Sequence, residues 1–319
     1  KFESTVRCCT QNGVRGGSAT VHFPIWHQEI EDILVLKNNK GTEDNRVRKL
    51  DYSIQISKLF YQRFMNNQDI TLFSPHEVPG LYEAFGTEHF DEMYEKYERA
   101  HSVPKKKIGA QDLFMSLLKE RAETGRMYIM NIDHCNTHSS FFEDEAKISM
   151  SNLFQEITLP TKPLQSFDDR DGEIALCILS AINVGQLTSD LKDLPELCDL
   201  AVRSLDEVID YQEYPVEAAR LSTVNRRSLG IGYIGLAHFL AKNKLKYDDK
   251  EAHKLVHRLS EHFQYNLIKT SVELAKEKGS CGYVSQTKYH GGLLPIDHYK
   301  KDVDEIVKPE YECDWESLR

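Results

Sequence analysis

The chain has 319 residues, of which 40% are hydrophobic and 28% are charged, and these proportions are ordinary for a globular protein. Its formal net charge of −10 argues against a general nucleic-acid binder, because such proteins carry a basic face. No apolar run approaches the ~18 residues that a membrane-spanning helix needs.

The cysteines and the chain ends suggest a setting for the protein. Seven cysteines include no Cys-x-x-Cys pair, and the chain does not open on an apolar signal segment. We therefore expect a reduced, cytoplasmic protein. The first residue is not methionine and residues 315–319 read as an unfinished helix, so we expect both ends to be cut from a longer chain. No repeat or flexible linker divides residues 1–319, which predicts a single domain.

The first distinctive segment is glycine-rich and covers residues 9–18. Gly13, Gly16 and Gly17 allow the backbone to turn freely and to approach a ligand closely. Arg15 adds a planar cation that suits phosphates or base edges. Taken alone, the segment is typical of a flexible surface loop.

Helices and strands follow one another along the rest of the chain. Apolar and polar residues alternate over 51–57, as in a half-buried strand. Apolar residues at helical spacing predict helices up to residue 66 and over 110–124, 193–212 and 248–278. Further strands are expected at 70–73, 127–130 and 174–182. Aromatic residues between 82 and 97 are interpreted as packing. Since helix and strand recur in this order, we expect the α/β class.

Two motifs could indicate other chemistries. His134, Cys135 and His138 are possible zinc ligands, and on a helix the two histidines would share a face. Polar residues around them predict a loop instead, and we expect no metal. Gly230, Gly232 and Gly235 match the dinucleotide motif, but a poor strand precedes them and the acidic residues follow too early. We interpret these glycines as close packing; a dehydrogenase would instead be retained on an immobilised nicotinamide cofactor.

The most informative stretch is residues 151–160. Asn152 and Glu156, two polar residues that could bind a hydroxyl-rich ligand, flank Phe154. The spacing alone is typical of a polar turn that enters a strand and stops at Pro160. Other motifs accompany it in order: GVRGG at 13–17, LKNN at 36–39, LFSPH at 72–76, NIDHCN at 131–136, GEIALC at 172–177, LPID at 294–297 and DWE at 314–316.

With these motifs, the chain resembles the middle of the large subunit of a class I ribonucleotide reductase, and we expect it to be most similar to the version carried by large tailed bacteriophages. The resemblance implies an incomplete α/β barrel of ten strands, with a finger loop at residues 151–156 inside it. The family reduces ribonucleoside diphosphates to deoxyribonucleotides for DNA replication. No cofactor is expected in this chain, because the family takes its radical from a di-iron small subunit and is regulated by nucleoside triphosphate effectors. Expected partners are therefore nucleotides, that small subunit, or complementary large-subunit fragments.

The resemblance also assigns roles to single residues. Asn152 and Glu156 would bind the ribose hydroxyls, with Glu156 as the base, and Cys177 would be one of two reducing cysteines. Gln11, Arg15, Gly16 and Gly17 would belong to a specificity loop that passes information from an effector to the active site. Other functional segments of the family's large subunit would lie outside this sequence, before Lys1 or beyond Arg319. One of them would hold the second reducing cysteine.

Phe154 departs from the family pattern, because the family has its radical cysteine at this position. We therefore expect no activity from this chain alone, and a phenyl ring that is mostly buried in the barrel. Three hypotheses follow: an enzyme core that works with other fragments, a pseudoenzyme that keeps nucleotide binding or subunit docking, and a relic with no role. We also expect Cys177 to be a thiol and the chain to form oligomers.

Overall fold

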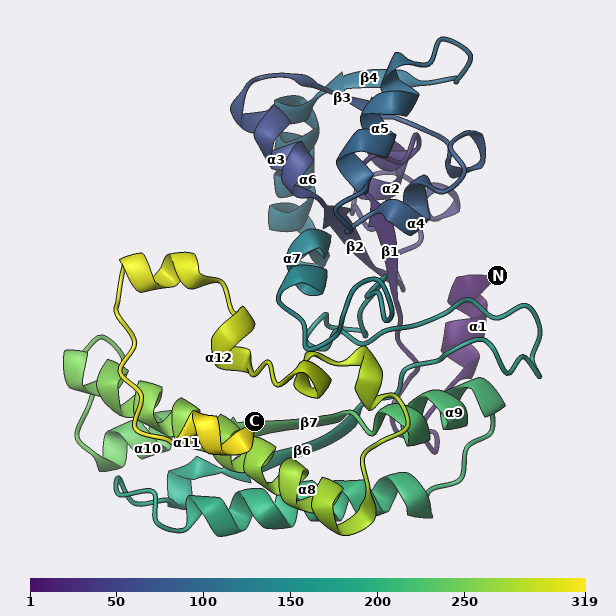
Figure 1. Ribbon diagram of the computed structural model, residues 1–319. Coiled ribbons are helices and arrows are strands. Elements are labelled where there is room, and N and C mark those ends of the chain that lie inside the picture. The colour runs from purple at the N-terminus through teal and green to yellow at the C-terminus, as the bar shows by residue number, and fades with distance from the viewer. The chain divides into compact units, whose positions relative to one another are not determined.

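The computed structural model describes residues 1–319, which form two compact units. Unit 1 comprises Lys1–Ser139 and Lys147–Pro160, and unit 2 comprises Ser140–Ala146 and Thr161–Arg319 (Figure 1). Each unit mixes helices with strands, which confirms the predicted α/β class. The expectation that residues 1–319 form a single domain stays a prediction.

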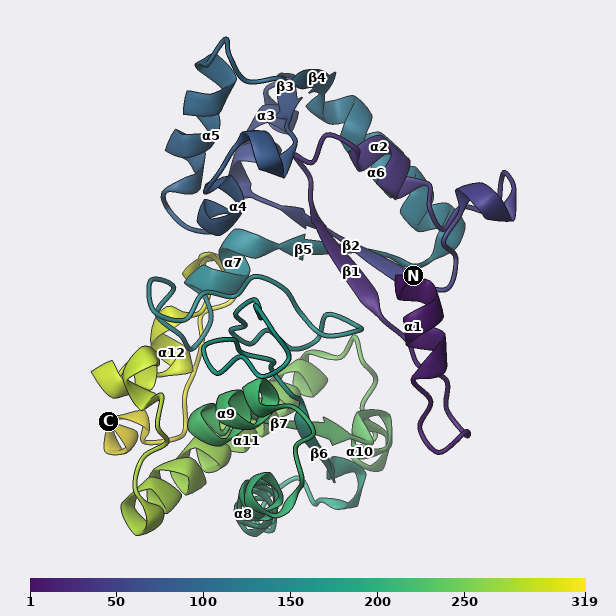
Figure 2. The same ribbon diagram turned by 90° about the vertical axis from the view of Figure 1, so that its right-hand side faces the viewer.

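Unit 1 is built on a parallel sheet of three strands in the order β1-β2-β5. The strands are β1 (Thr20–Pro24), β2 (Asp51–Ile56) and β5 (Met127–Asn131), and Figure 2 shows them side by side. Apolar Ile54 and Ile56 of β2 alternate with polar Ser53 and Gln55, and all four side chains are buried. Because successive side chains of a strand point to opposite faces, the sheet has one apolar face and one face rich in polar groups.

An antiparallel pair, β3 (Asp69–Leu72) and β4 (Lys106–Gly109), completes the strands of unit 1. The strands and helices expected between residues 51 and 130 are confirmed, with ends that differ by a few residues. The helices of the unit are α1 (Phe2–Cys8), α2 (Ile30–Leu34), α3 (Lys58–Met65), α4 (Leu81–Ala84), α5 (Phe90–Arg99), α6 (Ala110–Thr124) and α7 (Ile132–Thr137).

Aromatic side chains fill much of the core of unit 1. Phe90 packs on Phe85 and on Tyr94, with ring centroids 4.7 and 5.4 Å apart. The Tyr94 hydroxyl accepts a hydrogen bond from the amide of Thr71 and donates one to its carbonyl, each at 2.7 Å. A buried tyrosine that satisfies its hydroxyl in this way serves packing, which confirms the interpretation of the aromatic residues.

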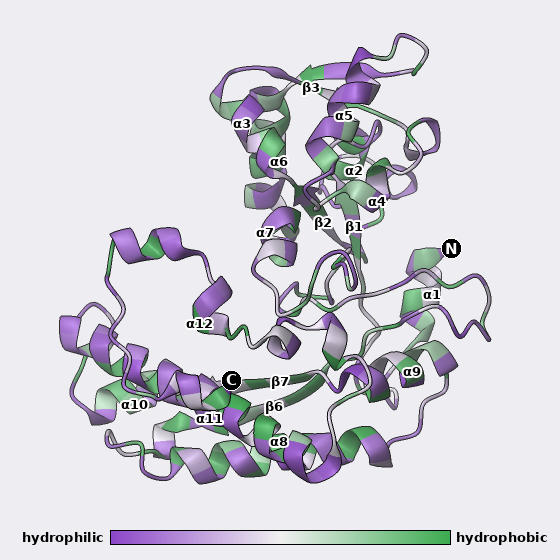
Figure 3. Ribbon diagram, in the orientation of Figure 1, coloured by the Kyte–Doolittle hydropathy of each residue, from purple (hydrophilic) through white to green (hydrophobic).

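Unit 2 holds a parallel pair of strands, β6 (Ile178–Asn183) and β7 (Leu229–Ile234). Figure 3 shows apolar residues on both strands and in stripes along the two longest helices. These helices, α8 and α11, pack against each other and confirm the helices expected at 193–212 and 248–278. The helices of unit 2 are α8 (Leu194–Tyr211), α9 (Glu217–Arg226), α10 (Leu236–Lys242), α11 (Lys250–Lys278) and α12 (Pro295–His298). Short 3-10 helices of the chain are Glu43–Asn45, Pro75–Glu77, Val184–Gln186, Val284–Gln286, Lys288–Gly291, Lys301–Glu305 and Trp315–Leu318.

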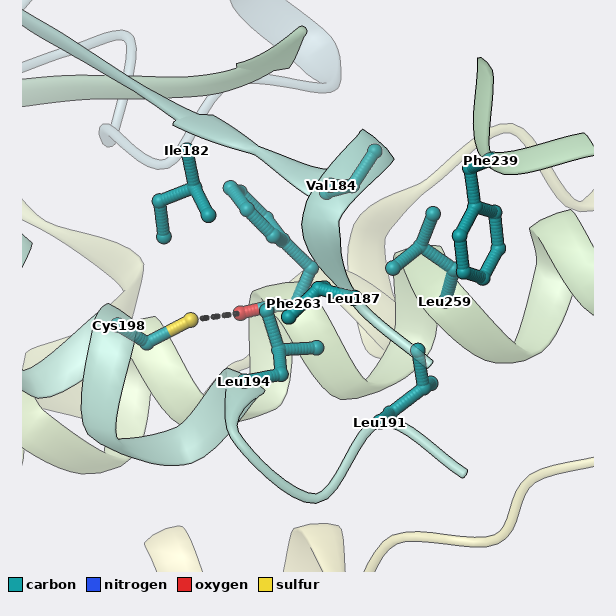
Figure 4. Packing of buried hydrophobic residues seen from close by; sticks show 9 residues of the cluster. All are labelled: Ile182, Val184, Leu187, Leu191, Leu194, Cys198, Phe239, Leu259 and Phe263. Carbon is teal, nitrogen blue, oxygen red and sulfur yellow. Dashed lines mark hydrogen bonds between the residues drawn. The ribbon is translucent and has the colours of Figure 1, made fainter. Parts of the chain in front are cut away.

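The core of unit 2 lies where β6, α8 and α11 meet (Figure 4). Leu194 and Cys198 of α8 pack there with Leu259 and Phe263 of α11. The Cys198 thiol lies 3.9 Å from the carbonyl oxygen of Phe263, and burial raises its pKa to about 12. Cys198 is therefore a packing residue rather than a reactive thiol.

The sequence-based prediction of the strands in unit 2 needs two corrections. β6 begins at Ile178 rather than at Ile174, because the preceding backbone bonds α9 instead, with the Ile174 amide donating to the Ala218 carbonyl. β7 was missed because its glycines weaken the strand pattern.

The glycine motif around β7 is not a dinucleotide site. Gly230 and Gly232 lie within the strand itself, whereas that motif needs its glycines in the turn that leads to a helix. Gly235 has a φ of 82°, and a Cβ there would lie 2.5 Å from the side-chain oxygen of Asn183. Close packing is thus confirmed at Gly235.

The sheets of the chain are open, with three, two and two strands, as expected for part of a barrel. None of the helices is both long and apolar enough to cross a membrane.

Candidate functional site

The finger loop, residues 151–156, lies in unit 1 against a polar face of the sheet. This polar face consists of Thr20 and His22 on β1 and Ser53 and Gln55 on β2. The parallel register pairs His22 with Ser53, so the side chains of both strands project to the same side. The alternation of polar residues along these two strands therefore creates a row of hydrogen-bonding groups beside the loop.

Three side chains of the polar face bind main-chain carbonyl oxygens of the loop and its entry. The Thr20 hydroxyl donates to the Leu153 carbonyl. The Nε2 atom of His22 lies 3.2 Å from the Ser151 carbonyl, and the Gln55 amide donates to the Ser149 carbonyl at 2.6 Å. Every second backbone position from 149 to 153 is thus held by a strand residue.

Gln155 makes the remaining contacts between the loop and the sheet. Its Oε1 accepts a hydrogen bond from the Ser53 hydroxyl at 2.5 Å, and its Nε2 donates to the Ile129 carbonyl of β5 at 2.7 Å. The backbone of Gln155 has a φ of 65°, in the left-handed region that non-glycine residues rarely adopt. Gln155 therefore points toward the sheet from a sharp turn.

Asn152 uses part of its amide group inside the loop. Its Oδ1 accepts a hydrogen bond from the Ile157 amide at 3.1 Å, and the neighbouring Ser151 hydroxyl donates to the Ile157 carbonyl at 2.5 Å. These bonds close the loop at its base. The NH₂ group of Asn152 is the part that a ligand would meet as a donor.

Phe154 and Glu156 are the exposed residues of the finger loop. The phenyl ring of Phe154 is 48% exposed, so the prediction that it is mostly buried is wrong. The reason is the inward turn of Gln155, which leaves the residues on either side of it facing outward. The carboxylate of Glu156 is accessible and can accept hydrogen bonds from ligand hydroxyls.

Burial perturbs the titration of one residue of the polar face. Desolvation lowers the pKa of His22 below its usual 6.5, although the hydrogen bond to Ser151 works in the opposite direction. The neutral imidazole is thus favoured, and its Nε2 then acts as the donor to the carbonyl.

The glycine-rich segment forms a tight exposed turn in unit 1. Gln11 and Arg15 form a bridge, with the Gln11 amide donating to the Arg15 carbonyl at 2.8 Å. A Cβ on Gly17 would lie 2.1 Å from the Val6 carbonyl oxygen, so close backbone packing requires glycine there. Gly16 has open space around it, and the packing does not require a glycine at that position.

Cys177 belongs to unit 2, whereas Asn152, Phe154 and Glu156 share one loop of unit 1. It is an exposed residue directly before β6. Four residues upstream, the carboxylate of Glu173 pairs with the Arg226 guanidinium at 2.6 Å, and both side chains are 3% exposed. Arg226 also stacks over the Tyr283 ring at 4.8 Å from its centroid. The segment that leads to Cys177 is thus anchored by a buried ion pair.

The histidine-rich segment differs from the sequence-based prediction. His134 lies in helix α7 rather than in a loop, and its ring centroid is 5.5 Å from that of His138. The buried Asn136 side chain of this helix donates to the carbonyls of Ile132 and Ile148 and so ties the helix to the chain that follows it. No group of three or more ligating side chains in the chain could hold a metal ion.

The polar face and Gln155 are the parts of the site that sequence reasoning missed. Alternating polar residues in β1 and β2 were visible in the sequence as Thr20 and His22, and as Ser53 and Gln55. Their shared target was not visible, because the loop that they hold lies about a hundred residues further along the chain.

Known proteins match the whole chain. A family model described as "Ribonucleotide reductase, barrel domain" matches residues 1–319. Ribonucleoside-diphosphate reductase subunit alpha from Buchnera aphidicola subsp. Schizaphis graminum is 56% identical over 100% of this chain and 42% of its own length. The corresponding proteins of Escherichia coli and Enterobacteria phage T4 are 52% and 45% identical with the same coverage. The chain thus spans less than half the length of these relatives, and over all of its own residues it belongs to the ribonucleotide reductase barrel-domain family.

Proposed function

We propose that this chain is part of the catalytic core of a ribonucleoside-diphosphate reductase alpha subunit and that it is inactive on its own. The observation that carries the proposal is the match of the barrel-domain family over all 319 residues. The finger loop, with the exposed carboxylate of Glu156 and the amide donor of Asn152, supports a site for the ribose of a nucleotide.

Two residues of the loop would handle the ribose hydroxyls. The accessible Glu156 carboxylate would accept a hydrogen bond from a hydroxyl and take up its proton as general base. The NH₂ group of Asn152 would donate to a ribose oxygen, while its Oδ1 stays bound to the loop backbone. Cys177 would supply one of two thiols that deliver reducing equivalents. Gln11 and Arg15 would contact the substrate from the specificity loop.

Phe154 is the reason to expect no turnover. In the family, a cysteine radical at this position removes a hydrogen atom from the ribose. A thiol suits that exchange because its S–H bond is about as strong as the ribose C–H bond. The C–H bonds of a phenyl ring are too strong for a reversible exchange, so Phe154 cannot replace the thiol. The ring would instead contact the nucleotide.

The proposed partners follow from the family. A small subunit with a di-iron centre would supply the radical to an active reductase, and nucleoside triphosphates would act as effectors. A bacteriophage origin is also part of the proposal, supported by the relative from phage T4 and testable from the genes around the reading frame.

A pseudoenzyme is the second candidate function, favoured by Phe154 in an otherwise well-formed loop. This protein would bind nucleotides, or dock a reductase subunit, without reducing a substrate. Loss of activity alone does not separate it from an enzyme core that works with complementary fragments.

Two assays test these proposals. Deoxyribonucleotide formation is measured for the chain alone and with a small subunit, thioredoxin and complementary alpha-subunit fragments. We expect no product from the chain alone, and turnover above a no-protein control would contradict this. Calorimetry then measures binding of a ribonucleoside diphosphate to the parent and to Glu156→Gln. Binding that weakens in the variant supports the nucleotide site, and absence of binding to the parent overturns it.

A further inference from the structure

The contacts of Gln155 differ from those of its neighbours in the finger loop. The polar face binds main-chain oxygens of the loop, but Gln155 is the loop residue whose side chain reaches back to the sheet. Both polar atoms of its amide are used, one on β2 and one on β5. Ser53, its partner on β2, is fully buried at 0% exposure.

We propose that Gln155 is a positioning residue that holds Phe154 and Glu156 in their outward orientation. Its own side chain is directed to the sheet and touches no ligand. The proposal rests on the proposed function only for its last step, in which the oriented Glu156 binds a nucleotide.

The backbone of the loop explains why such a residue is needed. The φ of 65° at Gln155 is unfavourable for a residue with a Cβ, so other contacts must hold the turn in place. The turn also has one backbone bond, from the Gln155 amide to the Asn152 carbonyl at 3.2 Å. The two side-chain bonds to the sheet add to this backbone bond, and we infer that they fix the direction of both neighbours.

The partner atoms make the position selective for glutamine. The buried Ser53 hydroxyl needs an acceptor, and the Ile129 carbonyl can take a donor. A carboxamide at the end of two methylene groups offers one of each. Leucine at position 155 would keep the bulk of the side chain but would leave the hydroxyl of Ser53 without this acceptor.

The test observes the loop tip directly. 4-Fluorophenylalanine is inserted at position 154 only, and ¹⁹F NMR spectra are recorded without nucleotide for the parent and for Gln155→Leu. We expect one narrow resonance in the parent and a broadened or divided resonance in Gln155→Leu. Gln155→Gly should also broaden or divide the resonance. Because glycine adopts the positive φ without strain, this variant keeps the test valid if Gln155→Leu fails to fold.

A matched control uses the same substitution in the same unit. Gln111 also donates from its side chain to a backbone carbonyl, that of Phe64 at 3.1 Å, but it lies on α6. Gln111→Leu should leave the resonance of position 154 unchanged. Ser53→Ala should broaden or divide that resonance as Gln155→Leu does. The double variant Ser53→Ala, Gln155→Leu should give the same spectrum as Gln155→Leu alone, because both changes remove the same contact.

Nucleotide calorimetry separates this proposal from the proposed function. If the ¹⁹F spectrum changes and affinity falls by about tenfold in Gln155→Leu, both stand. If the spectrum changes but the parent binds no nucleotide, Gln155 still positions the tip and the proposed function fails. An unchanged ¹⁹F spectrum in both Gln155 variants overturns the positioning role, whatever the affinity.

Discussion

At the scale of single residues, His22 links the anchoring of the finger loop to pH. Its lowered pKa means that the unfolded chain takes up a proton near pH 6.5 before the folded chain does. Stability is therefore unaffected by His22 above that pH and falls as the pH drops below it, toward the lower native pKa. Denaturant unfolding between about pH 8 and pH 5 should show a larger loss for the parent than for His22→Gln. Parallel curves for the two proteins would contradict this prediction, and other histidines cancel in the comparison.

Because Phe154 is exposed, its replacement should lower the free energy of unfolding less than expected for a buried residue. Full burial in a barrel would have implied a loss of ~2–4 kcal/mol for Phe154→Cys. With the ring 48% exposed, we expect the free energy of unfolding to fall by less than about 1.5 kcal/mol. Thermal and denaturant unfolding of both proteins measure the difference. A loss above about 3 kcal/mol would show that the ring is covered in solution, and Phe2→Ala, at an exposed position of α1, serves as a control near zero.

At the scale of elements, the sequence predicted those that are set by local pattern. The amphipathic spacing of α8 and α11 and the alternation in β2 are local signals, and the structure confirms all three. β7 was missed because two glycines remove the side chains that carry a strand pattern. α7 was misread because Asn136, a residue typical of loops, is bonded to the distant Ile148 carbonyl.

The same reasoning applies to the candidate site. Its loop was found by resemblance, since Asn152, Phe154 and Glu156 are adjacent in sequence. The polar face was not predicted because the register of parallel strands and the distance to the loop depend on tertiary packing. The role of Cys177 stays a prediction, as do the roles of Gln11 and Arg15.

The Glu173–Arg226 ion pair ties the segment before Cys177 to the end of α9. In Arg226→Met, the buried carboxylate of Glu173 would keep one counter-ion, the ammonium of Lys162 at 2.9 Å. We expect the free energy of unfolding to fall by up to roughly 3–5 kcal/mol, because the buried carboxylate loses its buried partner and keeps only the half-exposed Lys162. Denaturant unfolding measures this loss.

The control for that change is an ion pair nearer the surface. Arg203 pairs with Glu277 at 2.8 Å, where the two side chains are 33% and 52% exposed. Arg203→Met should cost less than about 1 kcal/mol. Equal losses in the two variants would show that burial does not distinguish the pairs.

At the scale of the whole molecule, exposed apolar side chains in unit 2 predict association. Leu200 and Tyr211 of α8 are 53% and 92% exposed, and Ile306 and Val307 are 83% and 72% exposed. Neighbouring exposed apolar residues such as Ile306 and Val307 are readily covered by a second copy of the chain. Light scattering after size exclusion at micromolar concentration should therefore show an oligomer, and Ile306→Lys should reduce its fraction. A monomer that binds no hydrophobic dye would contradict the prediction.

The sheet binds the finger loop through main-chain atoms, and this affects which residues of the loop can change during evolution. Thr20, His22 and Gln55 contact oxygen atoms that every amino acid possesses, so they recognise the course of the chain and not its side chains. Substitutions at positions 154 and 156, whose side chains are exposed, can therefore accumulate while the loop keeps its path. A family member could thus lose a reactive side chain at the loop tip through one substitution and keep the path of the loop. Later substitutions at the tip could then select a different ligand.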